Sequence, residues 1–600
     1  MTQNKSRMIR TFMRWNLFKN TLLGLAILSL TGCQTLSFPK QDVQNVHLFA
    51  FNDFHGHLEP SQRSITIPDP HSPQNNIKLP VGGASYLADA IDKLRSQHPS
   101  HAVISAGDLM SASPLISSLF LDEATIEVMN EIALDFNVIG NHELDRGTQE
   151  LQRIQSGGCI AYTRMQPCQI NGAFTGAKFD FLAANIYSKQ YPEQRLFPAY
   201  KVKHFDGIPV AFIGLTLKTA PSSVAATGIQ DLVFRDEAET VNALIPELKQ
   251  QGIEAIVVVI HDGVMAQQPQ AFGQKSCEGL QGPLLQVLEQ LDSEVDVVIS
   301  GHTHQAYLCD YATRNPAKPF LLTSAGQYGD MITDINLQID VKSKDILHKD
   351  ARQIPVQSEP FHIGTTLISP SEAYETFSKS AKVEAILQPY RQAVDQIAKQ
   401  VIAQANTPIV RKPSSSGESP LGLLIADAQQ AAAVRQGSLG SDFALMNPGG
   451  IRADLMINAE KQIRFIDLYS VQPFANTLVT MTLSGQQIRD LLEQQWSGAN
   501  ASFPKILQPS ATLSYQYNNV ATNSPRARDI RINGRALADQ QNYRVTVNSF
   551  LAEGGDNFSV LRQGTQHTIA GADLQALQDY LVEHAPVSAP IPGRIRLINE

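Results

Sequence analysis

The chain has 600 residues, more than one hydrophobic core usually supports, so the sequence predicts two or three domains. Hydrophobic residues make up 43% of it and charged residues 18%, proportions that are typical of a globular protein. The net charge of −9 excludes an overall basic field that would attract nucleic acid, so a protein that handles polyanions would need metal ions or a few arginines.

Residues 1–32 are typical of a bacterial lipoprotein signal peptide. A basic stretch precedes an apolar run at 21–30, which is too short to span a bilayer comfortably. The run ends in Leu30-Thr31-Gly32-Cys33, which resembles a lipobox, where cleavage leaves the cysteine to be lipidated. An ordinary signal peptide with an incidental cysteine is the alternative. We expect an exported protein with a lipid anchor at Cys33 and a tether at 33–44. By resemblance to Gram-negative lipoproteins, Gln34 favours the outer membrane, facing the periplasm or the cell surface.

Four further cysteines remain after Cys33, and an even number in an exported chain suggests two disulfides. Of the three possible connectivities we predict the pairing of sequence neighbours, Cys159 with Cys168 and Cys277 with Cys309. Free buried thiols or a zinc site are the alternatives, although no C-x-x-C spacing supports zinc.

The first half of the chain alternates apolar runs with helical patterns, which is typical of a layered α/β domain. The predicted strands are 46–51, 102–105, 136–139, 209–215, 253–260 and 295–300, and the predicted helices are 84–94 and 123–132. Polar residues of chemical interest follow several of these strands, where an α/β fold usually places its site.

The second half begins with a helical pattern at 371–404, which predicts a connecting helix. A polar loop rich in proline, glycine and serine follows at 411–417. A second α/β unit is then predicted, with a helix at 421–435 and strands at 443–446, 478–483, 512–517 and 543–548.

Five short segments in the first half carry the ligand types of a metal centre. They are Asp53-Phe54-His55, Gly107-Asp108, Gly140-Asn141-His142-Glu143, His261-Asp262-Gly263 and Gly301-His302-Thr303-His304. Each alone is a common polar loop. Together, and placed after apolar runs, they supply the oxygen donors and imidazoles of a divalent-metal site that activates water for attack on phosphorus.

These motifs resemble those of the bacterial and animal 5′-nucleotidases, including periplasmic UDP-sugar hydrolases, of the calcineurin-like metallophosphoesterase superfamily. The resemblance covers nearly the whole mature chain. It implies an α/β fold with an N-terminal four-layer α/β/β/α metallophosphoesterase domain at 45–365. A linker helix at 366–404 would join it to a C-terminal α/β substrate-binding domain at 405–600, and rotation about this linker would control access to the site.

The resemblance also implies roles for single residues. Two divalent ions (Zn, Mn, Co or Mg) would be bound. Asp53, His55, Asp108 and His304 would hold one ion, and Asp108, Asn141, His261 and His302 the other, with Asp108 bridging. Some relatives carry glutamine at the position of His304. His142 would be the catalytic histidine, oriented and charged by Asp145, for which a helix N-cap is a compatible alternative role. No role follows for Glu143.

In the second half, Asn447-Pro448-Gly449-Gly450-Ile451-Arg452 resembles the substrate loop of the family, with Arg452 as a fork for phosphate. The family pattern implies that Phe474 and Phe550 sandwich the nucleobase and that Asp556 binds the ribose, with Asn476 nearby. Core packing is the alternative role for each phenylalanine. Relatives carry further arginines where this chain has 415–418, and Arg411 or Lys412 could replace them.

The sequence thus predicts a nucleoside 5′-monophosphate hydrolase for nucleotide salvage that acts on small nucleotides rather than nucleic-acid polymers and also takes UDP-sugars. The alternatives on the same fold are a 2′,3′-cyclic-nucleotide phosphodiesterase and an NAD or nucleotide-sugar pyrophosphatase. A non-catalytic surface binding protein is disfavoured because no metal ligand is missing. The H-E-x-x-H and G-x-S-x-G motifs of proteases are absent from the sequence.

Overall fold

The computed structural model describes residues 42–60, 62–163, 165–224, 226–266, 272–363, 366–436, 440–474, 476–518 and 525–598. The predicted signal peptide and Cys33 lie outside the described residues. The chain from Val43 to Glu600 forms one unit by its internal contacts.

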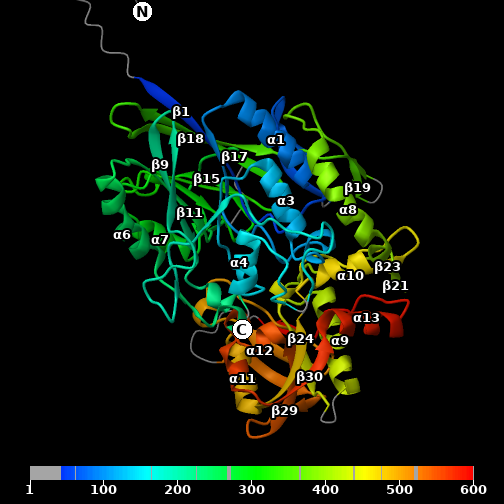
Figure 1. Ribbon diagram of the computed structural model, residues 1–600. Helices are drawn as coiled ribbons and strands as arrows, with labels where there is room; N and C mark the ends of the chain where they lie inside the picture. The colour runs from blue at the N-terminus through cyan, green and yellow to red at the C-terminus, as the bar shows by residue number, and fades with distance from the viewer. Residues whose placement is uncertain are drawn as a thin grey trace, which may run out of the picture. The chain divides into compact units, whose positions relative to one another are not determined.

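Two six-stranded sheets dominate the first half (Figure 1). The first has the order β18 (Ile346–Pro355), β17 (Met331–Asp340), β1 (Val43–Phe51), β4 (His101–Ser105), β5 (Phe136–Val138), β6 (Asp180–Leu182). The second has the order β15 (Ala306–Asp310), β16 (Leu321–Ala325), β14 (Val297–Ser300), β11 (Ala255–His261), β9 (Ile208–Thr216), β8 (Tyr200–Phe205).

The alternation of side chains along β1 shows how these sheets are layered. Leu48 and Ala50 point into a core that also contains Phe212 of β9 and Val257 of β11, so the two sheets pack face to face. Phe49 and Phe51 point to the opposite face, which is covered by α1 (Ala84–Gln97), α3 (Glu123–Ile132), α4 (Thr148–Ser156) and α8 (Ala381–Ala398). The outer face of the second sheet is covered by α6 (Glu237–Gln250) and α7 (Leu284–Gln290). The predicted four-layer α/β/β/α arrangement is confirmed.

The central strands of both sheets run parallel, which places their carboxyl ends on a common edge. β1 pairs in parallel with β4, and β4 with β5. In the second sheet β11 pairs in parallel with both β9 and β14. The five polar motifs follow β1, β4, β5, β11 and β14, so the topology brings them to one place.

The C-terminal half contains two smaller sheets. One has the order β25 (Gln508–Pro509), β22 (Phe443–Met446), β29 (Asn542–Asn548), β24 (Thr477–Ser484), β30 (Thr565–Ala572). The other has the order β28 (Arg535–Ala536), β27 (Ala527–Ile532), β26 (Leu513–Asn518), β31 (Ile595–Ile598). The main helices are α9 (Pro420–Gln436), α10 (Phe465–Val471), α11 (Gly485–Glu493) and α13 (Asp573–Glu583).

Short elements complete the described chain. They are the two-stranded pairs β2 (Arg63–Asp69) with β3 (Ser72–Val81), β7 (Ile186–Ser188) with β10 (Leu232–Phe234), β12 (Met265–Ala266) with β13 (Leu280–Gln281), and β19 (Phe361–Ile363) with β20 (Thr366–Ile368). The short helices are α2 (Leu115–Ser118), α5 (Ala226–Ile229) and α12 (Ser549–Ala552).

The connecting helix is shorter than the pattern at 371–404 predicts. The Gln357 side chain donates to the carbonyls of Ser371, Tyr374 and Glu375, which holds the first part of this segment as a loop. The last part forms β21 (Val401–Gln404), which pairs with β23 (Gln462–Arg464). Helix α8 occupies only the middle, where Tyr390 packs edge-on against Phe120.

Disulfides join Cys159 to Cys168 and Cys277 to Cys309, which confirms the predicted pairing. The second of these ties β15 to the loop that precedes β13. Among the described residues, none of the helices has the length and apolar character needed to cross a membrane.

Candidate metal centre and substrate pocket

Backbone hydrogen bonds join the loop after β1 to the loop after β4, and they position the first three candidate ligands. The Asp53 N–H donates to the Gly107 carbonyl over 3.0 Å, and the His55 N–H donates to the Asp108 carbonyl over 2.9 Å. Asp53, His55 and Asp108 are therefore held side by side, although the two carboxylates are far apart in sequence. This common loop framework positions one side of the site.

Two groups of ligand atoms result, each with its atoms within 4.8 Å of one another: Asp53, His55 and His304 in one, Asp108, His261 and His302 in the other. In the first group His304 Nε2 lies 3.3 Å from Asp53 Oδ1. In the second, His261 Nε2 lies 3.1 Å from Asp108 Oδ2. The same Asp108 oxygen is 3.6 Å from His55 Nε2, so this carboxylate lies between the groups.

Three imidazoles are oriented through their Nδ1 atoms. His55 Nδ1 donates to the Ser111 carbonyl over 2.9 Å, His261 Nδ1 to the Ala106 carbonyl over 2.8 Å, and His304 Nδ1 to Gln327 Oε1 over 2.6 Å. In the neutral form of each ring this pattern places the proton on Nδ1 and directs the lone pair of Nε2 into the site, as metal-binding histidines require. Within the described chain, Asn141 Oδ1 is buried without a hydrogen-bond partner. The donor set therefore fits divalent cations.

The backbone at several of these ligands is strained. Asp53, His55, Asp108, His302 and His304 all have φ between 46° and 69°, a region that residues other than glycine rarely adopt. Gly140 allows the loops to approach, since a Cβ there would lie 2.2 Å from Asp108 Oδ1. Strain concentrated at neighbouring polar residues marks this region as a functional site.

The histidines differ sharply in their affinity for protons. Burial, reinforced by the charge of His261, lowers the pKa of His302 to about 3. Burial also disfavours a charged His261, but the Asp108 and Asp53 carboxylates outweigh it and raise the pKa of His261 to about 10. The position next to His261 Nε2 thus favours positive charge, which a metal ion would supply in place of the proton.

His142 and Asp145 form the predicted pair, with His142 Nδ1 2.7 Å from Asp145 Oδ2. Burial lowers the pKa of His142, but Asp145 and Asp108 outweigh it, and the net pKa is raised. The backbone N–H of His142 also donates to Asp108 Oδ1 over 2.9 Å. The N-cap position of helix α4 is Gly147, so Asp145 is not the cap of that helix.

A pocket of about 250 Å³ adjoins these residues and is lined by both halves of the chain. Asn141, His142 and His302 contribute from the first half. The second half contributes most of the predicted substrate residues: Asn447, Gly450, Arg452, Phe474, Asn476, Phe550 and Asp556. The Phe474 ring stacks on His142 with centroids 5.8 Å apart, and the Arg452 guanidinium lies 5.8 Å from the centre of the same ring. The predicted substrate residues and the candidate metal ligands therefore face one space.

Arg411 is placed apart from this pocket. It lines a separate depression with Lys412, and one of its NH groups donates to the Ile451 carbonyl over 2.9 Å. Residues 415–418, where relatives carry arginines, form a hydrogen-bonded turn outside the pocket. The buried Glu418 accepts from Ser416 Oγ and from the backbone N–H of Arg594, both over 2.8 Å. Neither segment adds a cation to the pocket.

Comparison with known families agrees with this geometry. The model of the calcineurin-like phosphoesterase family matches residues 47–306, and that of the 5′-nucleotidase C-terminal domain matches residues 401–563. This chain belongs to the 5′-nucleotidase family of calcineurin-like phosphoesterases. It is therefore a phosphoester hydrolase of a divalent-metal-dependent family, and the predicted fold and enzyme class are confirmed.

Single proteins and solved structures are also similar to this chain, two of them along nearly all of its length. An uncharacterized protein in the pqq-V 5′ region of Acinetobacter calcoaceticus is 55% identical over 198 residues, 32% of this chain and 97% of that protein. Endonuclease YhcR of Bacillus subtilis (strain 168) is 29% identical over 92% of this chain, which spans 41% of its length. The crystal structure of a 5′-nucleotidase precursor from Thermus thermophilus has 25% identity and a TM-score of 0.70, covering 93% of this chain and 100% of that chain.

Glu143, for which the sequence gives no role, connects two loops of the candidate site. Its buried carboxylate accepts the N–H groups of Asp108, Leu109 and Gly140 over 2.7–2.9 Å. It thereby ties the Asp108 loop to the loop that carries Asn141. Burial and the nearby Asp108 carboxylate raise the pKa of Glu143 to about 7, so these donors do not fully offset the cost of burying the charge.

We expect Glu143→Gln to weaken metal binding about 10- to 100-fold, the range typical of residues that support metal ligands. The amide NH₂ would face backbone N–H groups that now point at carboxylate oxygens, and the Asp108 loop would shift. Titration of the apo-protein with Mn²⁺ checks this, with the exposed Glu239→Gln as control and thermal melting as a measure of folding. An unchanged titration midpoint in a folded variant would contradict the role.

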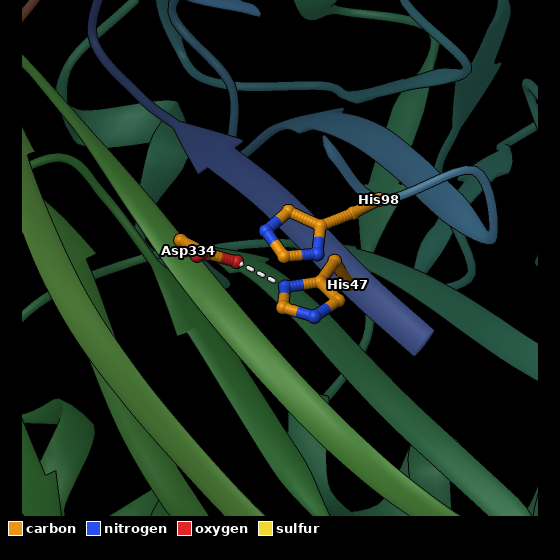
Figure 2. A group of neighbouring side chains, drawn as sticks. All are labelled: His47, His98 and Asp334. Atoms are coloured by element: carbon orange, nitrogen blue, oxygen red, sulfur yellow. Dashed lines mark hydrogen bonds and ion pairs between the residues drawn. The ribbon is translucent and has the colours of Figure 1, made fainter. Parts of the chain in front are cut away.

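His47, His98 and Asp334 form another group of potential ligands, which shares no residue with the five motifs (Figure 2). His47 Nδ1 bonds to Asp334 Oδ1 over 2.7 Å, and Arg352 Nε donates to the other carboxylate oxygen over 2.9 Å. The two imidazole rings stack with centroids 3.6 Å apart and an interplanar angle of 20°. Because an imidazole binds a metal in its ring plane, stacked rings do not direct two lone pairs at one ion. We assign this group to stacking and ion pairing.

Proposed function

We propose that the protein is an exported 5′-nucleotidase that removes phosphate from nucleoside 5′-monophosphates and also hydrolyses UDP-sugars, for nucleotide salvage. The observation that carries this proposal is the single pocket lined by the metal-ligand residues His302 and Asn141 together with Arg452, Phe474 and Phe550. One end of the pocket suits a phosphate beside cations, and the other suits a flat base with a sugar.

The metal ligands follow the two groups of atoms. Asp53, His55, Asp108 and His304 would hold one divalent ion, and Asp108, Asn141, His261 and His302 a second. Two such ions would supply Lewis-acid charge for the phosphoryl oxygens and lower the pKa of a water molecule. The protonated His142, held by Asp145, donates a hydrogen bond to a phosphoryl oxygen or a proton to the leaving alkoxide.

Arg452 is the residue best placed to bind the phosphate from the second half. Its NH2 atom is buried and has no hydrogen-bond partner among the described residues, so it has a donor available for a ligand. Burial lowers the pKa of His55, the Asp108 carboxylate opposes this, and the charge of Arg452 adds to the lowering. Its field therefore reaches the metal ligands, where the phosphate of a substrate would lie.

The nucleoside end would be formed by aromatic and polar groups. Phe550 packs on Gly555, where a Cβ would lie 2.5 Å from the ring, and so presents a flat surface beside Asp556. Asp556 accepts from Asn447 Nδ2 over 2.7 Å and has further lone pairs for ribose hydroxyls. A base stacked on such a ring is held without regard to its identity.

We expect Phe550→Ala to raise KM for AMP about 5- to 160-fold with little change in kcat, because stacking on one ring contributes about 1–3 kcal/mol. Phe474→Ala should change KM and kcat together, since that ring also stacks on His142. Phe361→Ala in the β19–β20 hairpin is the control. Steady-state kinetics with AMP decide the point, and unchanged KM in both pocket variants would refute the base sandwich.

The function as a whole is tested by identifying the products that the purified protein releases: inorganic phosphate from a monoester, and mononucleotides or a sugar phosphate from a pyrophosphate or a cyclic diester. The substrates are AMP, UDP-glucose, NAD and 2′,3′-cyclic AMP, each with EDTA and with Mn, Co, Zn or Mg restored. Preferred hydrolysis of AMP supports the proposal. Preferred cleavage of the cyclic nucleotide or of NAD would establish one of the alternative activities. If none of the four substrates gives a metal-dependent product, the proposal that the protein is a phosphohydrolase is refuted.

Export is supported by two observations. Both disulfides are formed, as is usual in an oxidising compartment outside the cytosol, and the related Thermus protein is described as a precursor. We propose anchoring in the outer membrane, facing the periplasm or the cell surface. Labelling with a radioactive fatty acid tests this, and label retained in Cys33→Ala would exclude that cysteine as the anchor.

A further inference from the structure

Lys505 is a cation on the wall of the pocket that no motif of the sequence marks. Its Nζ lies 2.5 Å from Asp556 Oδ1, while Asn447 Nδ2 donates to Asp556 Oδ2 over 2.7 Å. Lys505, Asn447 and Asp556 all line the pocket. The carboxylate expected to receive the ribose thus has a donor on each oxygen and a positive charge beside it.

This ion pair is held from both sides by neighbouring contacts. Asn500 Nδ2 donates to the Asp556 carbonyl over 2.9 Å, and the Lys505 N–H donates to the Gln495 carbonyl over 3.1 Å. Asp556 is 7% exposed and has a φ of 54°, a strained conformation for a residue other than glycine. Asp556 is therefore fixed, strained and mostly buried. Its ion pair with Lys505 differs in this from the mobile ion pairs on protein surfaces, which contribute little to stability.

The charges of the pocket exceed what a nucleoside monophosphate needs. Arg452 lies at the metal-ligand end and has an NH2 without a partner among the described residues, so a single phosphate finds its cations there. Lys505 lies beside Asp556 instead. It uses one of its three N–H donors on the carboxylate, and 36% of its side chain remains exposed. Among the described residues Asp556 is the anionic partner of this ammonium, and a neutral ribose would not supply a second one.

We propose that Lys505 binds a second phosphate, carried on the 2′ or 3′ oxygen of the ribose, and that nucleoside bisphosphates are substrates of this enzyme. The inference rests on the proposed nucleotidase function, since it needs the nucleotide to lie in this pocket. The reaction is still hydrolysis of the 5′ ester. Water supplies a hydroxyl to phosphorus and a proton to the 5′ oxygen, and the second phosphate stays on the nucleoside.

The experiment compares kcat/KM for AMP, adenosine 3′,5′-bisphosphate and adenosine 2′,5′-bisphosphate in the metal-loaded enzyme. The wild type is expected to use at least one bisphosphate as well as AMP or better. In Lys505→Met the ratio of bisphosphate to AMP should fall by about 10-fold or more, because a hydrogen bond to a charged group is lost. Lys505→Arg should keep the ratio within about 3-fold, which separates charge from folding. Lys178→Met, with the same charge change at an exposed position, should leave the ratio unchanged.

Which bisphosphate responds identifies the ribose oxygen. A wild type that disfavours both bisphosphates about 10-fold against AMP would overturn the inference, since that factor is about 1.4 kcal/mol of transition-state binding. So would equal losses for AMP and the bisphosphates in Lys505→Met, because Lys505 would then only hold Asp556. If the wild type fails to hydrolyse AMP as well, the proposed function itself has failed, so the two failures are distinguishable.

Discussion

Asp108→Asn is expected to lower kcat by more than about 100-fold and to reduce the metal content of the protein. Substitution of a residue that only supports metal ligands lowers metal affinity or activity about 10- to 100-fold. Asp108 lies directly beside histidines of both groups of ligands, so a larger loss is expected. An asparagine would remove the negative charge between His55 and His261. Its amide nitrogen could also take the position of the oxygen that now accepts the backbone N–H of His142, and that hydrogen bond would be lost.

The measurement combines kcat for AMP with metal analysis of the purified variant after dialysis against a limited Mn²⁺ concentration. The control is Asp206→Asn, an exposed aspartate that makes the same chemical change away from the site. Thermal melting shows whether the variant is folded. Wild-type metal content together with kcat within about 3-fold of wild type would exclude Asp108 as a bridging ligand, because loss of a shared ligand costs more than that.

The strand ends of the first half could be predicted because burial there is nearly complete. β9 and β11 are buried at every position, so they read as continuous apolar runs, and β11 ends at the candidate ligand His261. The β2–β3 hairpin gives no such signal, since proline, serine and asparagine interrupt its apolar residues. The apolar pattern of helix α3 predicts both of its observed ends, Glu123 and Ile132.

Residues whose role depends on distant backbone could not be predicted. Glu143 acts on the Asp108 N–H, which lies 35 residues away, and Lys505 pairs with Asp556 across 51 residues. Neither spacing belongs to a helix or a strand period, so only the folded loops bring them together. The same holds for Arg411, which the sequence offers as a replacement for the arginines that relatives carry at 415–418, but whose guanidinium donates to the Ile451 carbonyl outside the pocket.

His142→Ala is expected to lower kcat about 10²- to 10⁴-fold, the contribution typical of a general acid, while the metal content stays at the wild-type level. His142 has one nitrogen bound to Asp145, and its ring packs edge-on against His55 with centroids 5.0 Å apart. The other nitrogen therefore faces both the pocket and the metal ligands. In its cationic form it would stabilise charge that develops on the phosphoryl group or the leaving oxygen.

Metal analysis decides between two roles for His142, because it also groups with His55 and Asp108 within ligand distance. Loss of an ion in His142→Ala would make it a ligand and overturn the catalytic assignment. Asp145→Asn is the matched variant: it keeps the hydrogen-bond geometry but removes the charge that raises the pKa of His142. If His142 works as a cation, Asp145→Asn should lower kcat by a smaller factor and shift the loss of activity at rising pH to a lower pH. The sign follows because removing the charge of Asp145 lowers the pKa of His142, so the imidazole loses its proton earlier as pH rises.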